Sequence, residues 1–132
     1  MTDTIVLAED DADLRAVYAE CLRRDGHRVW EAGDGAEALE MVRANSPQLL
    51  IIDLWMPILN GFEVLEHLVN APEAVGMKVV VLTHQDDSDT RLEGFSLGIC
   101  DYWAKKDFSL TALCQKVREV LETESLPSYT SS

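Results

Sequence analysis

Short apolar runs alternate along the chain with segments whose apolar residues recur at every third or fourth position. The runs predict β-strands at 4–8, 28–32, 49–52, 78–82 and 101–104. The segments between and after them predict amphipathic helices at about 14–25, 36–45, 61–70, 87–97 and 109–123. Asp25-Gly26 and Ser46-Pro47 are turn signals, and they end the first two helices.

Regular alternation of strands and helices indicates an α/β fold, in which helices cover both faces of a parallel sheet. The strands at 4–8 and 49–52 are the most continuously apolar, so we place them in the centre of the sheet. With right-handed crossovers, this favours a doubly wound, flavodoxin-like sheet of five strands in the order 2-1-3-4-5, with five helices. Such a sheet has its ligand crevice at the carboxyl ends of strands 1 and 3.

Composition narrows the class of protein. The 132 residues are 47% hydrophobic, which suits one folded domain, expected at 1–123, followed by a polar tail at 124–132. A net charge of −13 argues against direct binding to nucleic acid, which requires clusters of Lys and Arg. The apolar runs are too short to cross a bilayer, and the first residues do not resemble a signal peptide. We therefore expect a cytoplasmic protein without direct nucleic acid or membrane contact.

The three cysteines show no CxxC spacing, so neither a disulfide framework nor a zinc site is expected. Cys21 and Cys114 lie on the apolar stripes of two predicted helices, where a cysteine is usually a small core residue.

Acidic residues follow the two central strands directly. Glu9, Asp10 and Asp11 come after the first strand, and Asp53 comes after the third. On the predicted topology Glu9, Asp10 and Asp53 converge, and three neighbouring carboxylates repel one another unless a cation neutralises them. An all-oxygen site of this kind suits Mg²⁺, with Mn²⁺ as an alternative. The simpler interpretation is helix capping, which we expect of Asp11.

Two further polar residues reach the same edge of the sheet. Thr83 ends the fourth strand, and Lys105 follows the fifth. A hydroxyl and an ammonium opposite a carboxylate and a divalent cation would make a binding site for a phosphoryl group. Either residue alone would be an ordinary strand-end or solvated side chain.

Four segments together resemble the receiver domain of two-component response regulators. They are VLAEDD at 6–11, LIIDLWMP at 50–57 with Asn60-Gly61, VVLT at 80–83, and GICDYWAK at 98–105. The resemblance covers about residues 4–122. Each motif is weak by itself, but the four in this order and spacing are specific.

The resemblance implies that Asp53 accepts a phosphoryl group from a phosphohistidine on a histidine kinase or histidine phosphotransfer protein. Asp10, Asp53 and the backbone carbonyl of Trp55 would ligate Mg²⁺, and Glu9 would act through water. Such a domain is phosphorylated and slowly dephosphorylates itself, and it is not a turnover enzyme.

The resemblance also implies a conformational switch. Lys105 would bind the phosphoryl group, Thr83 would move towards it, and Tyr102 would follow inward. The face built from the helix at 87–97, the strand at 101–104 and the helix at 109–123 would then change shape and bind a downstream protein.

Three positions depart from the family pattern. Lys106 stands where a proline with a cis peptide is usual, and we expect a trans bond because a cis bond costs roughly 2.5–4 kcal/mol without proline. His84 stands where the family mostly has a small residue. We expect Trp55 and His84 to modulate access to the phosphoryl group, although His84 is equally interpretable as a surface imidazole without a role.

Two other functions are compatible with this fold. One is a receiver-like interaction module that works without phosphorylation. Only Lys106 and His84 support it, and the full set of site residues disfavours it: Glu9, Asp10, Asp53, Thr83 and Lys105. The other is a Mg²⁺-dependent phosphohydrolase with an aspartyl phosphate. It is disfavoured because Trp55 occupies the position of the second acid of such enzymes.

Overall fold

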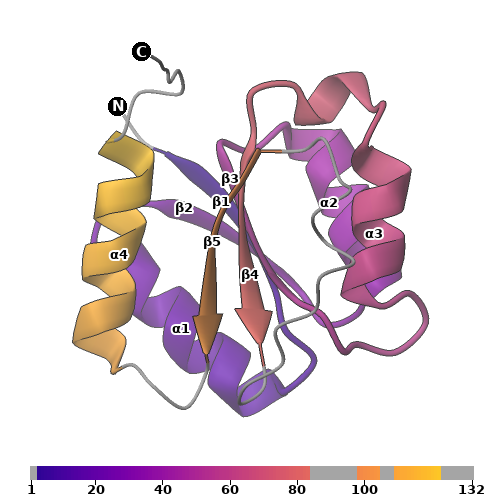
Figure 1. Ribbon diagram of the computed structural model, residues 1–132. Helices are drawn as coiled ribbons and strands as arrows, with labels where there is room; N and C mark the ends of the chain where they lie inside the picture. The colour runs from indigo at the N-terminus through magenta and orange to yellow at the C-terminus, as the bar shows by residue number, and fades with distance from the viewer. Residues whose placement is uncertain (1–2, 84–97, 105–108, 123–132) are drawn as a thin grey trace.

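The computed structural model contains one sheet of five parallel strands with helices on both faces (Figure 1). It describes residues 3–83, 98–104 and 109–122. The strands are β1 Thr4–Ala8, β2 Arg28–Ala32, β3 Leu49–Asp53, β4 Lys78–Thr83 and β5 Gly98–Ala104. The helices are α1 Ala12–Arg24, α2 Gly35–Asn45, α3 Gly61–Leu68, the short 3-10 helix η1 Pro72–Ala74 and α4 Leu110–Glu122. The strand order is β2-β1-β3-β4-β5, which confirms the predicted doubly wound sheet.

Within the described residues, the predicted strands and helices agree with the structure except near β5. This strand begins at Gly98, three residues earlier than predicted, and its pairing with β4 shifts between Val79 and Val80. Such a bulge interrupts the alternation of side chains, so the first half of the strand lacks a clear strand pattern. The 3-10 helix η1 was not predicted. The helix predicted at 109–123 is α4, whereas the helix predicted at 87–97 and the tail at 124–132 lie outside the described residues.

The sheet separates two hydrophobic cores. On one face α2 and α3 pack against residues of β1, β3 and β4, and on the other face α1 and α4 pack against the alternate residues of the same strands (Figure 1). All five residues of β3 are buried, as expected for the central strand of a parallel sheet. Burial on both faces explains why this strand is an unbroken apolar run up to Asp53.

A disulfide between Cys21 and Cys114 joins α1 to α4. The expectation that the cysteines form no disulfide is therefore wrong, although Cys114 is a buried core residue as predicted. A spacing of 93 residues gives no local signal for the pairing, because it depends on how two helices pack on one face of the sheet.

The helices that the structure describes are all too short or too polar to span a bilayer.

Candidate functional site

Three carboxylates meet at the carboxyl ends of β1 and β3. Glu9, Asp10 and Asp53 can place one oxygen each within 4.8 Å of one another. Glu9 is fully buried and Asp53 is 1% exposed, whereas Asp10 is exposed. The cluster therefore has a buried floor and an open side, and it brings together the three acids that the topology predicted.

The backbone and side chain of Glu9 are held by three hydrogen bonds from different parts of the chain. Its amide donates to the carbonyl oxygen of Ala32 over 3.0 Å, which continues the pairing of β1 with β2. Its carboxylate accepts the amide of Asp11 at 3.0 Å. Its carbonyl oxygen accepts Nη1 of Arg15 at 2.8 Å. The position of this carboxylate is thus set by β2, by the start of α1 and by Arg15.

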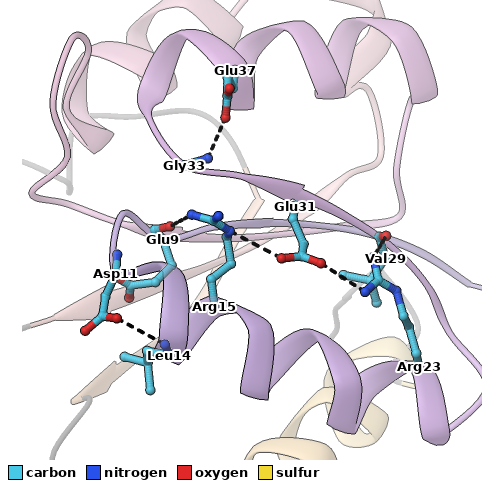
Figure 2. Close-up of polar contacts among 9 residues, drawn as sticks. All are labelled: Glu9, Asp11, Leu14, Arg15, Arg23, Val29, Glu31, Gly33 and Glu37. Carbon is cyan, nitrogen blue, oxygen red and sulfur yellow. Dashed lines mark hydrogen bonds and ion pairs between the residues drawn. The ribbon is translucent and has the colours of Figure 1, made fainter.

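Arg15 begins a chain of ion pairs that runs from the acid cluster along α1 (Figure 2). Its Nε pairs with one carboxylate oxygen of Glu31 at 3.3 Å, and Nη1 of Arg23 pairs with the other at 2.9 Å. Arg23 also donates to the carbonyl oxygen of Val29 at 2.7 Å. No pattern in the sequence marks these residues, since only the packing of α1 beside β2 brings them together. The chain of contacts anchors the loop after β1 to the edge strand.

Helix caps fix the two loops that carry the acids. Asp11 is the N-cap of α1 and accepts the amide of Leu14 at 3.1 Å, as predicted. Asn60 is the N-cap of α3 and forms a capping box with Glu63, with bonds of 2.8 and 3.0 Å. The loop after Asp53 therefore ends in a defined helix start, as the Asn-Gly pair indicated.

Two glycines allow close approach around this loop. A Cβ on Gly61 would lie 2.7 Å from the carbonyl oxygen of Asp53, and one on Gly35 would lie 1.9 Å from that of Leu59. Gly61 also donates its amide to the carbonyl oxygen of Leu54 at 2.8 Å. The N-termini of α2 and α3 thus pack directly on the backbone that presents Asp53.

Trp55 lies at the rim of the cluster. Its amide donates to a carboxylate oxygen of Asp53 at 3.1 Å, and the residue is 44% exposed. The ring meets Phe62 of α3 edge-on, with centroids 5.7 Å apart. A large apolar surface therefore stands next to the acid cluster and faces solvent.

The remaining predicted site residues lie at the ends of β4 and β5. Thr83 is the last residue of β4 and pairs in register with Ala104, one strand away from Asp53. Tyr102 on β5 is 48% exposed. His84 and Lys105 lie outside the described residues, as does the Lys106 peptide bond that was expected to be trans.

The donor set fits a hard divalent cation. All three side chains offer carboxylate oxygens, which Mg²⁺ prefers and which also accept Mn²⁺. Two buried carboxylates in one cluster repel each other without a counter-charge, and Arg15 contacts the carbonyl oxygen of Glu9 while pairing with Glu31. Glu9, Asp10 and Asp53 are thus the residues that would hold the cation.

Comparison with known proteins shows the family and the fold of the chain. A model of the response regulator receiver domain matches residues 5–118. Response regulator MprA of Mycobacterium ulcerans is 33% identical over 126 residues, which cover 96% of this chain and 53% of that protein. Its namesake in Mycobacterium leprae is 35% identical over 117 residues, which cover 89% of this chain and 50% of that protein. The chain spans about half the length of these relatives.

Solved structures with the same fold include a Francisella receiver domain, that of response regulator 1452. It has a TM-score of 0.77 and 26% identity, and the match covers 92% of this chain and 98% of that one. The receiver domain of the sensor histidine kinase PA1611 of Pseudomonas aeruginosa, solved with a magnesium ion in its active-site cleft, has a TM-score of 0.80 and 22% identity. That match covers 93% of this chain and all of the other.

Proposed function

Because this chain belongs to the response regulator receiver domain family, we propose that it accepts a phosphoryl group on Asp53 from a phosphohistidine. The donor is a histidine kinase or a histidine phosphotransfer protein. The observation that carries the proposal is the convergence of Asp53 with Glu9 and Asp10 at the carboxyl edge of the central strand. The chain is an acceptor and a signal, not a turnover enzyme.

The proposed transfer is a displacement at phosphorus. A carboxylate oxygen of Asp53 forms the new P–O bond while the P–N bond to the donor imidazole breaks, and the ring nitrogen keeps the electron pair and takes up a proton. Asp53 is buried at the end of β3, and the Trp55 amide holds one of its oxygens. This fixed carboxylate presents the other oxygen for attack with little reorganisation.

A bound Mg²⁺ would neutralise charge on the transferring phosphoryl group. Glu9 and Asp10, with Asp53, would hold it, and the backbone carbonyl of Trp55 would complete the protein ligands. The three hydrogen bonds that fix Glu9 supply the rigidity that such a site requires.

The proposed signal passes to the face that contains β5 and α4. Lys105 would bind the phosphoryl group, and Thr83, at the end of β4, would donate a hydrogen bond to it. Tyr102 is exposed in this structure and would turn inward after phosphorylation. The altered face would then bind a downstream protein.

The exposed ring of Trp55 supports a second part of the proposal. Trp55, together with His84, would partly shield the phosphoryl group from water and lengthen its lifetime. These two residues would modulate access rather than take part in transfer.

The experiment is phosphorylation of the whole chain with acetyl phosphate and Mg²⁺, followed by intact mass measurement. We expect one added phosphoryl group, lost in Asp53→Asn and retained in Asp13→Asn, which removes an exposed acid from the first turn of α1. Chelation of Mg²⁺ should abolish uptake.

Other outcomes would select the alternatives. If the chain takes up no phosphoryl group from acetyl phosphate or from a phosphorylated histidine kinase, it is an interaction module that works without phosphorylation. Sustained hydrolysis of a phosphate ester would instead identify a phosphohydrolase.

A further inference from the structure

The disulfide between Cys21 and Cys114 lines a surface groove between α1 and α4, away from the acid cluster. The groove has a volume of about 390 Å³, and its lining includes Val17, Cys21, Leu110, Cys114 and Arg118. The Cα atoms of the two cysteines are 6.8 Å apart, within the range that a disulfide can bridge. We propose that these cysteines are a reversible redox pair, which clamps α4 to α1 when oxidised.

The two helices are also held together without the disulfide. Arg118 of α4 donates to both carboxylate oxygens of Asp25, the C-cap of α1, at 2.7 and 3.2 Å. Leu113 and Val117 of α4 share a buried core cluster with Leu22 of α1. After reduction the two thiols therefore stay next to each other, and this high effective concentration favours formation of the bond again.

The two cysteines differ in exposure, which gives the reaction an order. Cys21 is partly exposed, whereas Cys114 is 7% exposed. A peroxide reaches Cys21 first: its thiolate attacks one oxygen, the O–O bond breaks, and the other oxygen leaves as water after taking a proton. The thiolate of Cys114 then attacks the sulfur of the resulting sulfenic acid, the S–O bond breaks, and the leaving oxygen takes a proton and departs as a second water. A dithiol reverses the bond by thiol–disulfide exchange.

The bond closes a loop of 93 residues, which contains β2, α2, β3, α3, β4 and β5. Cross-linking a loop of this length restricts the unfolded chain strongly. Oxidation is therefore expected to raise the melting temperature of the domain by at least about 5 °C. The inference does not depend on phosphorylation of Asp53.

The test counts free thiols in the whole chain. The reduced protein, freed of reductant, is treated with hydrogen peroxide or oxidised glutathione, then denatured in acid, neutralised in denaturant and alkylated with N-ethylmaleimide. We expect three adducts before oxidation and one after it, since the chain has three cysteines. Dithiothreitol should restore three adducts.

Peptide mapping identifies the partners. Trypsin places Cys21, Cys114 and Cys100 on separate peptides, at 16–23, 107–116 and 92–105. The oxidised protein should give a linked pair of 16–23 with 107–116. Cys100→Ser should keep this pair, and Cys114→Ser should abolish both the pair and the redox dependence of the melting temperature.

Three results would overturn the inference. They are three free thiols after oxidation, a linked peptide that contains 92–105 in place of the expected pair, and an unchanged melting temperature when a mapped Cys21–Cys114 bond is reduced. The measurements on the unmodified chain require no variant to fold.

Discussion

Nη1 of Arg15 donates to the carbonyl oxygen of Glu9 at 2.8 Å, so a helix residue holds the backbone of a buried member of the acid cluster. Its Nε pairs at the same time with Glu31 of β2. Glu31 is shared between Arg15 and Arg23, and Arg15 reaches the acid cluster through a backbone carbonyl oxygen, so we assign it the role of positioning Glu9.

We therefore expect Arg15→Gln to weaken Mg²⁺ binding by about three- to tenfold, an effect of roughly 1 kcal/mol for a lost charge-assisted bond. Isothermal titration calorimetry with MgCl₂ measures it. The Mg²⁺ affinity of Arg15→Lys should lie between those of the unmodified chain and Arg15→Gln. An ammonium is a point charge and lacks the planar fork of donors that serves both partners. The matched control is Arg24→Gln, whose partner Glu20 is exposed on the same helix. Equal or tighter binding in Arg15→Gln would contradict the positioning role.

Gly35→Ala should destabilise the domain, because the new Cβ would lie 1.9 Å from the carbonyl oxygen of Leu59. Backbone must move to relieve this contact, and overpacking of this kind costs about 1–3 kcal/mol. Urea denaturation followed by circular dichroism measures the loss. Gly76→Asn is the control: nothing lies within 4 Å of its Cβ, and Asn tolerates the positive φ of 79°. A loss in Gly35→Ala no larger than in the control would argue against the close packing of α2 on this loop.

Ile58→Gly should stabilise the domain. Ile58 has a φ of 71°, which strains the backbone of a β-branched residue. It is also 74% exposed, so burial of its side chain offsets little of this strain. Left-handed backbone costs an L-residue roughly 1–2 kcal/mol, part of which the greater freedom of unfolded Gly offsets, so a net gain of about 0.5–1 kcal/mol is expected. Val75→Gly provides the comparison, since Val75 is 83% exposed at a φ of −64° and should gain nothing. The measurement is the denaturation midpoint of each variant. A midpoint of Ile58→Gly no higher than that of Val75→Gly would contradict the strain at Ile58.

The pair of Asp25 and Arg118 should make a small, pH-dependent contribution to stability. The hydrogen bond from the Arg118 guanidinium holds the pKa of Asp25 below its ordinary value of 3.8. A lowered folded-state pKa stabilises the domain above the ordinary value, and this stabilisation is lost as the pH falls through the folded-state pKa.

Asp25→Asn should thus lower the melting temperature by at most about 3 °C at pH 7, because the pair lies at the surface within reach of solvent. High salt should reduce the difference. The difference should vanish in strong acid. Arg118→Gln should have a similar effect that does not add to that of Asp25→Asn. A difference that persists unchanged below the folded-state pKa would exclude the ion pair as its source.

The exposed Trp55 beside Asp53 should lengthen the lifetime of the phosphoryl group on Asp53. Trp55→Asn combined with His84→Ala should dephosphorylate several-fold faster, because water would reach the acyl phosphate more freely. Loss of the added phosphoryl mass with time, after removal of the donor, measures the rate. Trp30→Phe, which changes an exposed indole on β2, should leave the decay unchanged. An unaltered rate in the double variant would refute shielding.

The periodicity of the chain was sufficient to predict the sheet. The unbroken run into Asp53 implied a central strand, and Glu9-Asp10 after β1 implied a shared edge, so the topology alone placed the three acids together. These features are readable because burial on both faces of a strand, and the turn chemistry at its end, leave a pattern in neighbouring residues.

Contacts between segments that are distant in sequence were decided only by the tertiary structure. The bond of Cys21 to Cys114 and the pair of Arg15 and Glu31 depend on the rotation and spacing of α1 against α4 and β2. The bulge in β5 depends on its pairing with β4. Side-chain packing sets the rotation and spacing of helices and the register of strands. An apolar helix stripe or an apolar run in the sequence is compatible with many such arrangements. The sequence by itself therefore determined which edge of the sheet carries the acids, whereas the folded chain determined what holds them there.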